Sequence, residues 1–256
     1  MNVSQIIFSP TGGTKQVTDT ITNAWGMDVN EIDLTNAETD YATLSLNKED
    51  IAIIAVPSFG GRVPALATQR ISKIRGNQAR CVIVCVYGNR AYEDTLIELN
   101  DIAAKSGFKV IAAVAAIAEH SIMHQYAAGR PDAKDHQELQ NFAKKILEKI
   151  NSSVAETSTL QIPGNNPYKK AGGAGLVPKA GSKCTNCGLC AKSCPAQAIS
   201  QENLRVTDSK KCISCMRCVA KCPQSARKVN GAMVSAAALA MKKACSTRKE
   251  NELYLS

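Results

Sequence analysis

Short apolar runs alternate with amphipathic segments along the first 150 residues. Each run has the length of a strand, and Pro, Gly or polar residues bound it. The pattern predicts buried strands at residues 3–8, 51–56, 81–87 and 110–117. The segments between the runs carry apolar residues three or four positions apart, which is typical of helices with one buried face. They predict helices at residues 15–25, 64–74, 92–105 and 132–150.

Strands that are apolar on both faces and separated by helices indicate a parallel sheet with helices on both sides. The predicted fold class is therefore α/β, with a doubly wound parallel sheet. Ligands of such sheets bind beyond the carboxyl ends of the strands, where the strand order reverses. Three loops leave those ends, at residues 9–14, 57–64 and 88–92.

The first of these loops connects a predicted strand to a predicted helix. Its residues are Ser9, Pro10, Thr11, Gly12, Gly13 and Thr14. N–H groups at the start of a helix attract anions, and glycines and hydroxyls let a phosphate come close, so the loop predicts a phosphate site. It is not a Walker A loop, and the absence of Gly-x-Gly-x-x-Gly disfavours a dinucleotide. The alternative is an ordinary turn with a threonine N-cap.

The composition of the chain changes after residue 150. Residues 1–150 hold 15 Lys+Arg, 17 Asp+Glu and two Cys, whereas residues 151–256 hold 16 Lys+Arg, five Asp+Glu and nine Cys. A change of this size indicates two modules, and a stretch rich in Pro and Gly at residues 161–183 separates them. We divide the chain into a first domain at 1–155, a linker at 156–182, a second domain at 183–230, and a C-terminal helix and tail at 231–256.

Eight of the 11 cysteines form two copies of the run C-x2-C-x2-C-x3-C-P, 28 residues apart. The first copy contains Cys184, Cys187, Cys190 and Cys194, and the second contains Cys212, Cys215, Cys218 and Cys222. Three thiolates at this spacing wrap one face of an iron–sulfur cube. The alternative is zinc, which usually pairs two C-x2-C halves about 15 to 20 residues apart and has no use for a third.

This run is the pattern of bacterial ferredoxins, and residues 181–230 resemble a bacterial two-cluster ferredoxin, a small α+β domain. In that family the fourth cysteine of each run binds the other cluster. The resemblance implies two [4Fe–4S] clusters, the first held by Cys184, Cys187, Cys190 and Cys222, and the second by Cys212, Cys215, Cys218 and Cys194. Met216 stands where the first copy has Gly188, and this difference leaves every ligand in place.

The first domain resembles flavodoxins. The strand Ile6-Ile7-Phe8 followed by Ser-x-Thr-Gly-x-Thr is similar to the loop that binds the phosphate of FMN in that family. The resemblance implies a flavodoxin-like doubly wound parallel sheet of five strands, with FMN as the cofactor of residues 1–155. It also implies two further FMN-binding loops, formed by Pro57, Ser58, Phe59, Gly60 and Gly61, and by Tyr87, Gly88, Asn89, Arg90 and Tyr92. Phe59, Tyr87 and Tyr92 are the candidates to stack on the flavin, and for each ring the alternative is packing in the core.

The remaining cysteines and the basic residues imply no further cofactor. Cys81 and Cys85 lie four positions apart on one face of a strand and are predicted to be small buried residues, while Cys245 is predicted to be incidental. The net charge of +9 suits nucleic acid, but only Tyr168 and Tyr254 follow residue 150 as stacking rings, so nucleic acid is disfavoured. An acidic redox partner protein explains the basic residues better.

Other classes of protein are disfavoured by what the sequence lacks. No apolar run approaches the length of a membrane helix, and the N-terminus has no basic region of a signal peptide, so we expect a cytoplasmic protein without a membrane span. The sequence contains no recognisable acid–base pair, nucleophile triad or nicotinamide fingerprint.

The two halves together resemble the flavodoxin–ferredoxin fusion proteins of anaerobes. The resemblance implies an electron-transfer protein that relays electrons between two [4Fe–4S] clusters and FMN, and so couples one-electron and two-electron redox partners. The alternative is a flavin-dependent reductase of a small acceptor (a quinone, an enoate or free flavin) that the clusters feed. A third hypothesis is that the protein is a redox sensor.

Overall fold

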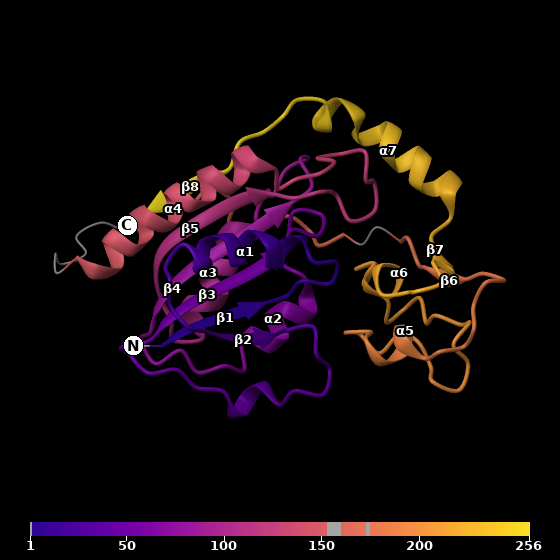
Figure 1. Cartoon of the computed structure of the whole chain (residues 1–256), viewed down its shortest axis with the longest axis horizontal. Helices are drawn as coiled ribbons and strands as arrows, with labels where there is room; N and C mark the ends of the chain where they lie inside the picture. The colour runs from indigo at the N-terminus through magenta and orange to yellow at the C-terminus, as the bar shows by residue number, and fades with distance from the viewer. Residues whose placement is uncertain (1, 153–159, 173–174) are drawn as a thin grey trace.

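The computed structural model describes residues 2–152, 160–172 and 175–256. They form two modules, and a long C-terminal helix leads from the second module back to the first (Figure 1). The domain boundary predicted at residue 155 lies outside the described residues.

The first module is built on one six-stranded sheet. Its strands are β1 (Val3–Ile7), β2 (Val29–Asp33), β3 (Ile51–Pro57), β4 (Arg80–Tyr87), β5 (Lys109–Ile117) and β8 (Glu252–Leu255). Their order across the sheet is β2-β1-β3-β4-β5-β8. Strands β1 to β5 are parallel, and the order 2-1-3-4-5 is that of the flavodoxin-like doubly wound fold. The predicted fold class is confirmed, as are the four strands located from apolar runs.

Two strands lie outside those runs. Strand β2 is at the edge of the sheet and half exposed, with Asn30, Glu31 and Asp33 among its five residues, so it has no apolar run to reveal it. Strand β8 comes from the end of the chain and pairs antiparallel with β5, with Tyr254 opposite Ala113. The sheet therefore has one strand more than the five predicted, because the C-terminal tail returns to the first module.

Four helices cover the sheet, two on each face. They are α1 (Gly13–Asn23), α2 (Ala65–Ile71), α3 (Thr95–Lys105) and α4 (Ala133–Asn151), and a 3-10 turn lies at Tyr41–Thr43. Helices α1 and α4 pack on one face, and α2 and α3 on the other. All four predicted helices are confirmed, with ends that agree to within three residues.

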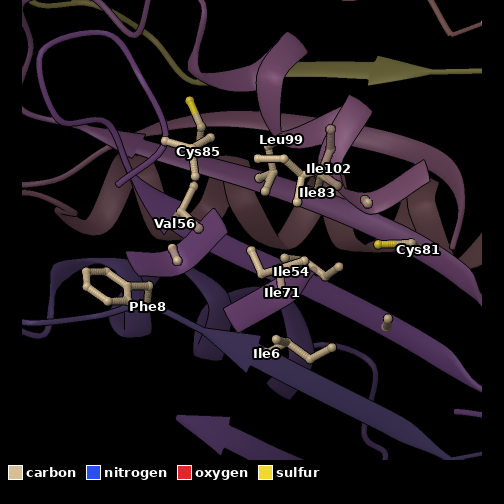
Figure 2. Packing of buried hydrophobic residues seen from close by; sticks show 14 of the residues in the cluster. Ile6, Phe8, Ile54, Val56, Ile71, Cys81, Ile83, Cys85, Leu99 and Ile102 are labelled. Carbon is tan, nitrogen blue, oxygen red and sulfur yellow. The ribbon is translucent and has the colours of Figure 1, made fainter. Parts of the chain in front are cut away.

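Alternating side chains of the central strands enter two separate cores. Ile54 and Ile83 belong to the core under α2 and α3, whereas Ile53 and Val84 belong to the core under α1 and α4. Burying one such side chain stabilises the fold by about 1.5–3 kcal/mol, so this module holds its shape through apolar packing. Cys81 and Cys85 lie in the core under α2 and α3 and are fully buried, as predicted (Figure 2).

The second module has little apolar core of its own. Its elements are β6 (Lys179–Ala180), α5 (Leu189–Lys192), α6 (Arg217–Ala220) and β7 (Arg227–Lys228). Among the described residues, the buried cluster inside it consists of Ala191, Ile199 and Cys218. A module this small depends on covalent or metal cross-links for its stability. Helices α5 and α6 begin and end 28 residues apart, so the repeat seen in the sequence is also a repeat of structure.

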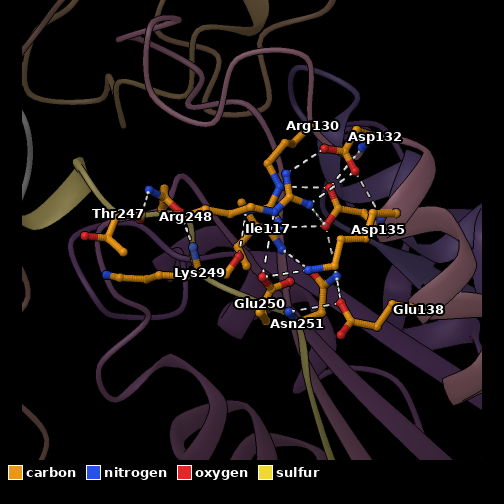
Figure 3. A network of polar contacts seen from close by, with 12 residues as sticks. Ile117, Arg130, Asp132, Asp135, Glu138, Thr247, Arg248, Lys249, Glu250 and Asn251 are labelled. Carbon is orange, nitrogen blue, oxygen red and sulfur yellow. Dashed lines mark hydrogen bonds and ion pairs between the residues drawn. The ribbon is translucent and has the colours of Figure 1, made fainter.

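The chain leaves the second module through α7 (Gly231–Cys245), which spans the distance back to the first module (Figure 1). A buried polar network then fixes the tail (Figure 3). Asn251 accepts a hydrogen bond from the N–H of Ile117 at 3.0 Å and donates to Glu138 at 2.6 Å. Arg130 pairs with Asp135 and donates to the Lys249 carbonyl at 2.8 Å. The second module is thus tied to the first at its C-terminal end.

Candidate iron–sulfur and flavin sites

One cavity in the second module brings together cysteines from both copies of the repeat. Cys184, Cys187 and Cys190 line it from the first copy, and Cys222 lines it from the second. These are the four thiols expected to hold the first cluster. Cys184 and Cys187 lie in the loop before α5, and Cys190 lies within α5. Cys222 lies close to them because β7 pairs with β6 and so brings the end of the second copy back beside the start of the first.

The other four cysteines form a second group. Burial raises the pKa of Cys215 to about 11 and that of Cys218 to about 12, and the nearby Cys194 and Cys212 add to both shifts. Cys194 belongs to the first copy of the repeat, yet it lies within electrostatic reach of the three thiols of the second. Four thiolates so close together repel one another, and iron would neutralise that repulsion.

The backbone around both groups supports sulfur ligation. The N–H of Ala198 donates to Cys194 Sγ at 3.3 Å, and the N–H of Ala226 donates to Cys222 Sγ at 3.2 Å. Burial acts to raise the pKa of Cys222, but this N–H and its neighbours outweigh burial and lower the pKa. Hydrogen bonds of this kind stabilise a thiolate and tune the potential of a cluster.

Met216 adopts the same backbone conformation as its counterpart Gly188. The φ angles are 61° at Met216 and 78° at Gly188, both in the left-handed region. A residue with a Cβ accepts this conformation at a cost of about 1–2 kcal/mol. Met216 is also buried, which offsets that cost, and the loop shape around the cysteines is kept in both copies.

In the described part of the chain, no three or more His, Cys, Asp or Glu side chains are arranged to hold a single metal ion. The fit to iron–sulfur clusters rests instead on two groups of four thiols, each with a backbone N–H aimed at a sulfur.

The predicted phosphate loop opens into a cavity of about 320 Å³. Ser9, Pro10, Thr11 and Gly12 line this cavity, which lies at the carboxyl end of β1 and the start of α1. Gly12 has a φ of 100° and caps α1 without any side-chain hydrogen bond, and Ser9 Oγ accepts from the N–H of Lys15 at 3.0 Å. Gly13 and Thr14 do not line the cavity. A Cβ on Gly13 would come within 3.1 Å of Ala118, and Thr14 is buried.

The opposite wall of this cavity belongs to the second module. Arg217, Ala220 and Lys221, from α6 and the position after it, line it together with Glu31 and Asp33 of β2. Arg217 Nη1 donates to the Ser9 carbonyl at 3.3 Å, and Arg217 Nη2 lies 3.5 Å from Asp33 Oδ2. The phosphate loop and the second copy of the cysteine repeat therefore face each other across one cavity.

The second predicted FMN loop is a tight turn. Phe59 and Arg62 exchange backbone hydrogen bonds at 3.0 and 3.3 Å, and Gly60 and Gly61 between them both have positive φ, which only glycine adopts without strain. Arg62 pairs with Glu98 at 2.7 and 2.8 Å and holds the turn against α3. Phe59 is half-buried, Pro57 ends β3, and Ser58 Oγ bonds Thr95 Oγ1 at 2.7 Å.

The linker packs over this turn. Asp94 is fully buried and accepts hydrogen bonds from the N–H groups of Asn165 at 2.9 Å and Lys169 at 2.7 Å. Arg62 donates to the Lys169 carbonyl, and its guanidinium lies 4.9 Å from the ring centre of Tyr168. The linker is therefore attached to the first module beside the predicted FMN loops.

The third predicted FMN loop makes most of its contacts with protein. Asn89 is buried and donates to the carbonyls of Cys245 and Thr247 at 3.0 and 2.9 Å.

Tyr92 donates to Glu252 at 2.6 Å, and its ring meets that of Tyr87 edge-on with 5.3 Å between centres. Arg90 pairs with Glu93, and Gly88 packs against His120. Tyr87 and Tyr92 thus pack in the core, and Cys245 is buried at the contact with Asn89.

Three residues that organise these sites escaped the sequence analysis. Arg217 lies inside a cysteine motif, where spacing identifies the ligands but says nothing of the residue between them. Asp94 and Asn251 are single polar residues whose partners are distant in sequence, and no local pattern marks them.

Residues 183–227 match the family described as the 4Fe-4S dicluster domain. This match, with the flavodoxin-like order of the first sheet, defines the class of protein: a flavodoxin-like domain joined to a ferredoxin-type domain with two [4Fe–4S] clusters. The predicted fusion architecture and the iron–sulfur cofactors are confirmed, and the chain has an electron-transfer or redox role.

Solved structures similar to the chain include flavodoxins. The flavodoxin of Streptococcus pneumoniae TIGR4 is 18% identical, with a TM-score of 0.42, over 57% of this chain and 99% of that one. The two-electron reduced flavodoxin of Megasphaera elsdenii is 17% identical, with a TM-score of 0.39, over 56% and 98%. The rubredoxin oxygen:oxidoreductase of the anaerobe Desulfovibrio gigas is 12% identical, with a TM-score of 0.41, over 59% of this chain and 37% of that one. A comparison with curated proteins finds no match. In the described residues, no helix has both the length and the apolar character needed to span a membrane.

Proposed function

We propose that FMN occupies the phosphate-loop cavity and that the chain relays electrons between FMN and the two clusters, coupling one-electron and two-electron redox partners. Bound FMN would supply one- and two-electron chemistry, and the clusters supply one-electron chemistry. The basic excess of residues 151–256 favours acidic proteins as partners.

One observation carries this proposal. The cavity lined by Ser9, Pro10, Thr11 and Gly12 is closed on its other side by α6, which lies within the second cysteine repeat. Arg217 lies between Cys215 and Cys218 in sequence, so the second group of cysteines includes neighbours of a residue that lines the cavity. In the described part of the chain, the residues lining the other cysteine cavity all belong to the second module. We therefore propose the order FMN, second cluster, first cluster.

The residues of the flavin and cluster sites would have distinct tasks. Ser9, Thr11 and Gly12, with the start of α1, would hold the phosphate through hydroxyl and N–H groups. Phe59 would contact the flavin, because Tyr87 and Tyr92 already pack on each other. The Arg62–Glu98 pair would hold the Phe59 turn in place. The N–H groups of Ala198 and Ala226 would set the charge on two cluster sulfurs.

Anaerobic purification followed by iron, sulfide and flavin analysis tests the proposal. We expect about eight iron atoms and one FMN per chain, and three redox-active centres in a potentiometric titration. Rapid reduction of the clusters by a one-electron donor should be followed by reduction of the flavin within the same chain. A chain with full iron content that does not bind FMN would contradict the relay. Saturable turnover of a small acceptor would instead indicate a reductase.

A further inference from the structure

Arg217 is held less tightly than the ion-paired arginines Arg62 and Arg130. Its side chain is 16% exposed and its Nε has no hydrogen-bond partner among the described residues. The two contacts of its Nη atoms, at 3.3 and 3.5 Å, are longer than charge-assisted hydrogen bonds, which are about 2.7–2.9 Å. Arg62, by contrast, makes two bonds to Glu98 at 2.7 and 2.8 Å. Arg217 therefore retains donor capacity at the wall of the cavity.

Arg217 is the partly buried cation that the second module contributes to this cavity. Lys15 Nζ is paired with Glu31 at 2.6 Å and Asp19 at 3.0 Å. Lys221 is exposed. Asp33 accepts hydrogen bonds from the N–H and hydroxyl of Thr35, at 2.7 and 2.5 Å, so its carboxylate keeps partners if Arg217 turns away.

On the basis of the proposed function, we propose that Arg217 of the ferredoxin-type module binds the phosphate of FMN from the side opposite to Ser9–Gly12. Guanidinium binds phosphate oxygens through paired N–H donors, and Lys221, the other cation of the second module at this cavity, is exposed. The phosphate would then be held by two modules, from positions 208 residues apart.

This arrangement couples cofactor binding to docking. A ligand that contacts both modules strengthens their association, and by linkage their association strengthens the binding of the ligand by the same factor. FMN would hold α6, and with it the second group of cysteines, against the phosphate loop. Loss of FMN would leave the docking to the weak Arg217 contacts, the hydrogen bond from Arg70 to the Pro195 carbonyl at 2.8 Å, the linker and the C-terminal tail.

The test compares Arg217→Gln with Arg217→Lys and with Arg205→Gln. Arg205 is an exposed arginine of the same module outside the cavity, so its variant removes the same charge elsewhere. FMN and riboflavin are titrated into flavin-free, cluster-loaded protein, with flavin fluorescence as the readout. We expect Arg217→Gln to weaken FMN binding at least tenfold and leave riboflavin binding unchanged. Arg217→Lys should restore part of the affinity, and Arg205→Gln should match the unaltered chain.

Hydrogen exchange at α6 gives a second readout that does not depend on electron transfer. FMN should slow exchange at Arg217–Ala220 in the unaltered chain, and riboflavin should not. The proposal is overturned if Arg217→Gln binds FMN as tightly as the unaltered chain, or weakens FMN and riboflavin equally. If the unaltered chain binds neither flavin, the proposed function itself fails.

Discussion

The amide oxygen of Asn251 accepts a buried hydrogen bond from the N–H of Ile117, 134 residues earlier in the chain. The same side chain donates to Glu138 and Asp135 of α4. One residue of the tail therefore satisfies polar groups at the end of β5 and on a helix that packs against the sheet. The second module lies between Ile117 and Asn251 in sequence. This bond therefore also fixes the place where the chain returns from the second module to the first.

Replacing Asn251 with alanine should destabilise the first module by about 2–3 kcal/mol, because the Ile117 N–H and two carboxylates lose a buried partner. Urea unfolding followed through Trp25, which is buried in this module, measures the change. Asn141→Ala removes an exposed asparagine from α4 and should change the free energy of unfolding by less than about 0.5 kcal/mol. Equal effects of the two substitutions would contradict the role given to Asn251.

The crossed ligand sets expected for the two clusters predict which variants behave alike. Cys222→Ala should lose the same cluster as Cys184→Ala, although the two residues lie in different copies of the repeat. Cys194→Ala should lose the same cluster as Cys212→Ala. Iron content should fall from about eight to about four in each variant, and electron paramagnetic resonance of the reduced protein identifies the cluster that remains. The control is Cys245→Ala, which should keep all the iron. If Cys222→Ala grouped with Cys212→Ala, the ligand sets would not be crossed.

The attachment of the linker should depend on pH through Asp94. Burial acts to raise the pKa of this carboxyl, but the N–H groups of Lys169 and Asn165 outweigh burial and lower it. A carboxyl whose pKa is lower in the folded chain stabilises the fold above its unfolded pKa of about 3.9, and that stabilisation is lost as the pH falls through the folded value. Protection of the Asn165 and Lys169 amides from hydrogen exchange, relative to their intrinsic rates, should therefore be full at pH 6 and decline below about pH 4.

The variant Asp94→Asn should weaken the same attachment at neutral pH, because an amide replaces one of the two accepting oxygens with a donor. Trypsin should then cleave after Lys169 and Lys170 faster than in the unaltered chain. Asp28→Asn, at an exposed carboxyl, should leave the cleavage rate unchanged. Unchanged cleavage in Asp94→Asn would show that the linker is held elsewhere.

Thr11 offers a test of the phosphate loop that does not disturb the clusters. It is exposed to the cavity, so Thr11→Val should raise the dissociation constant of FMN about tenfold through loss of a hydroxyl partner, with iron and sulfide contents unchanged. Riboflavin binding should be unaffected, because riboflavin has no phosphate to contact this loop. A parallel loss of FMN and riboflavin would instead indicate that the substitution distorts the whole site.

Local patterns in the sequence were sufficient for the central strands, the four helices of the first module and the repeated cysteine motif. Strands such as Ile51–Pro57 are buried on both faces and must be apolar throughout, and cluster ligands need a fixed spacing, so both leave a signal within a few residues. The loop that begins at Ser9 was located for the same reason, since its residues, strand and helix are contiguous.

Only the tertiary structure decided where the two modules meet. Glu252–Leu255 joins the sheet because β5 presents an open edge to it, and the bonds of Asn251, Asp94 and Arg217 join residues dozens to hundreds of positions apart. A hydrogen bond across such a separation depends on how the whole chain folds, and either partner alone looks like any other polar residue. The sequence by itself therefore determined the two modules and the repeated cysteine motif, and the folded chain determined that the second copy of this motif faces the predicted phosphate loop.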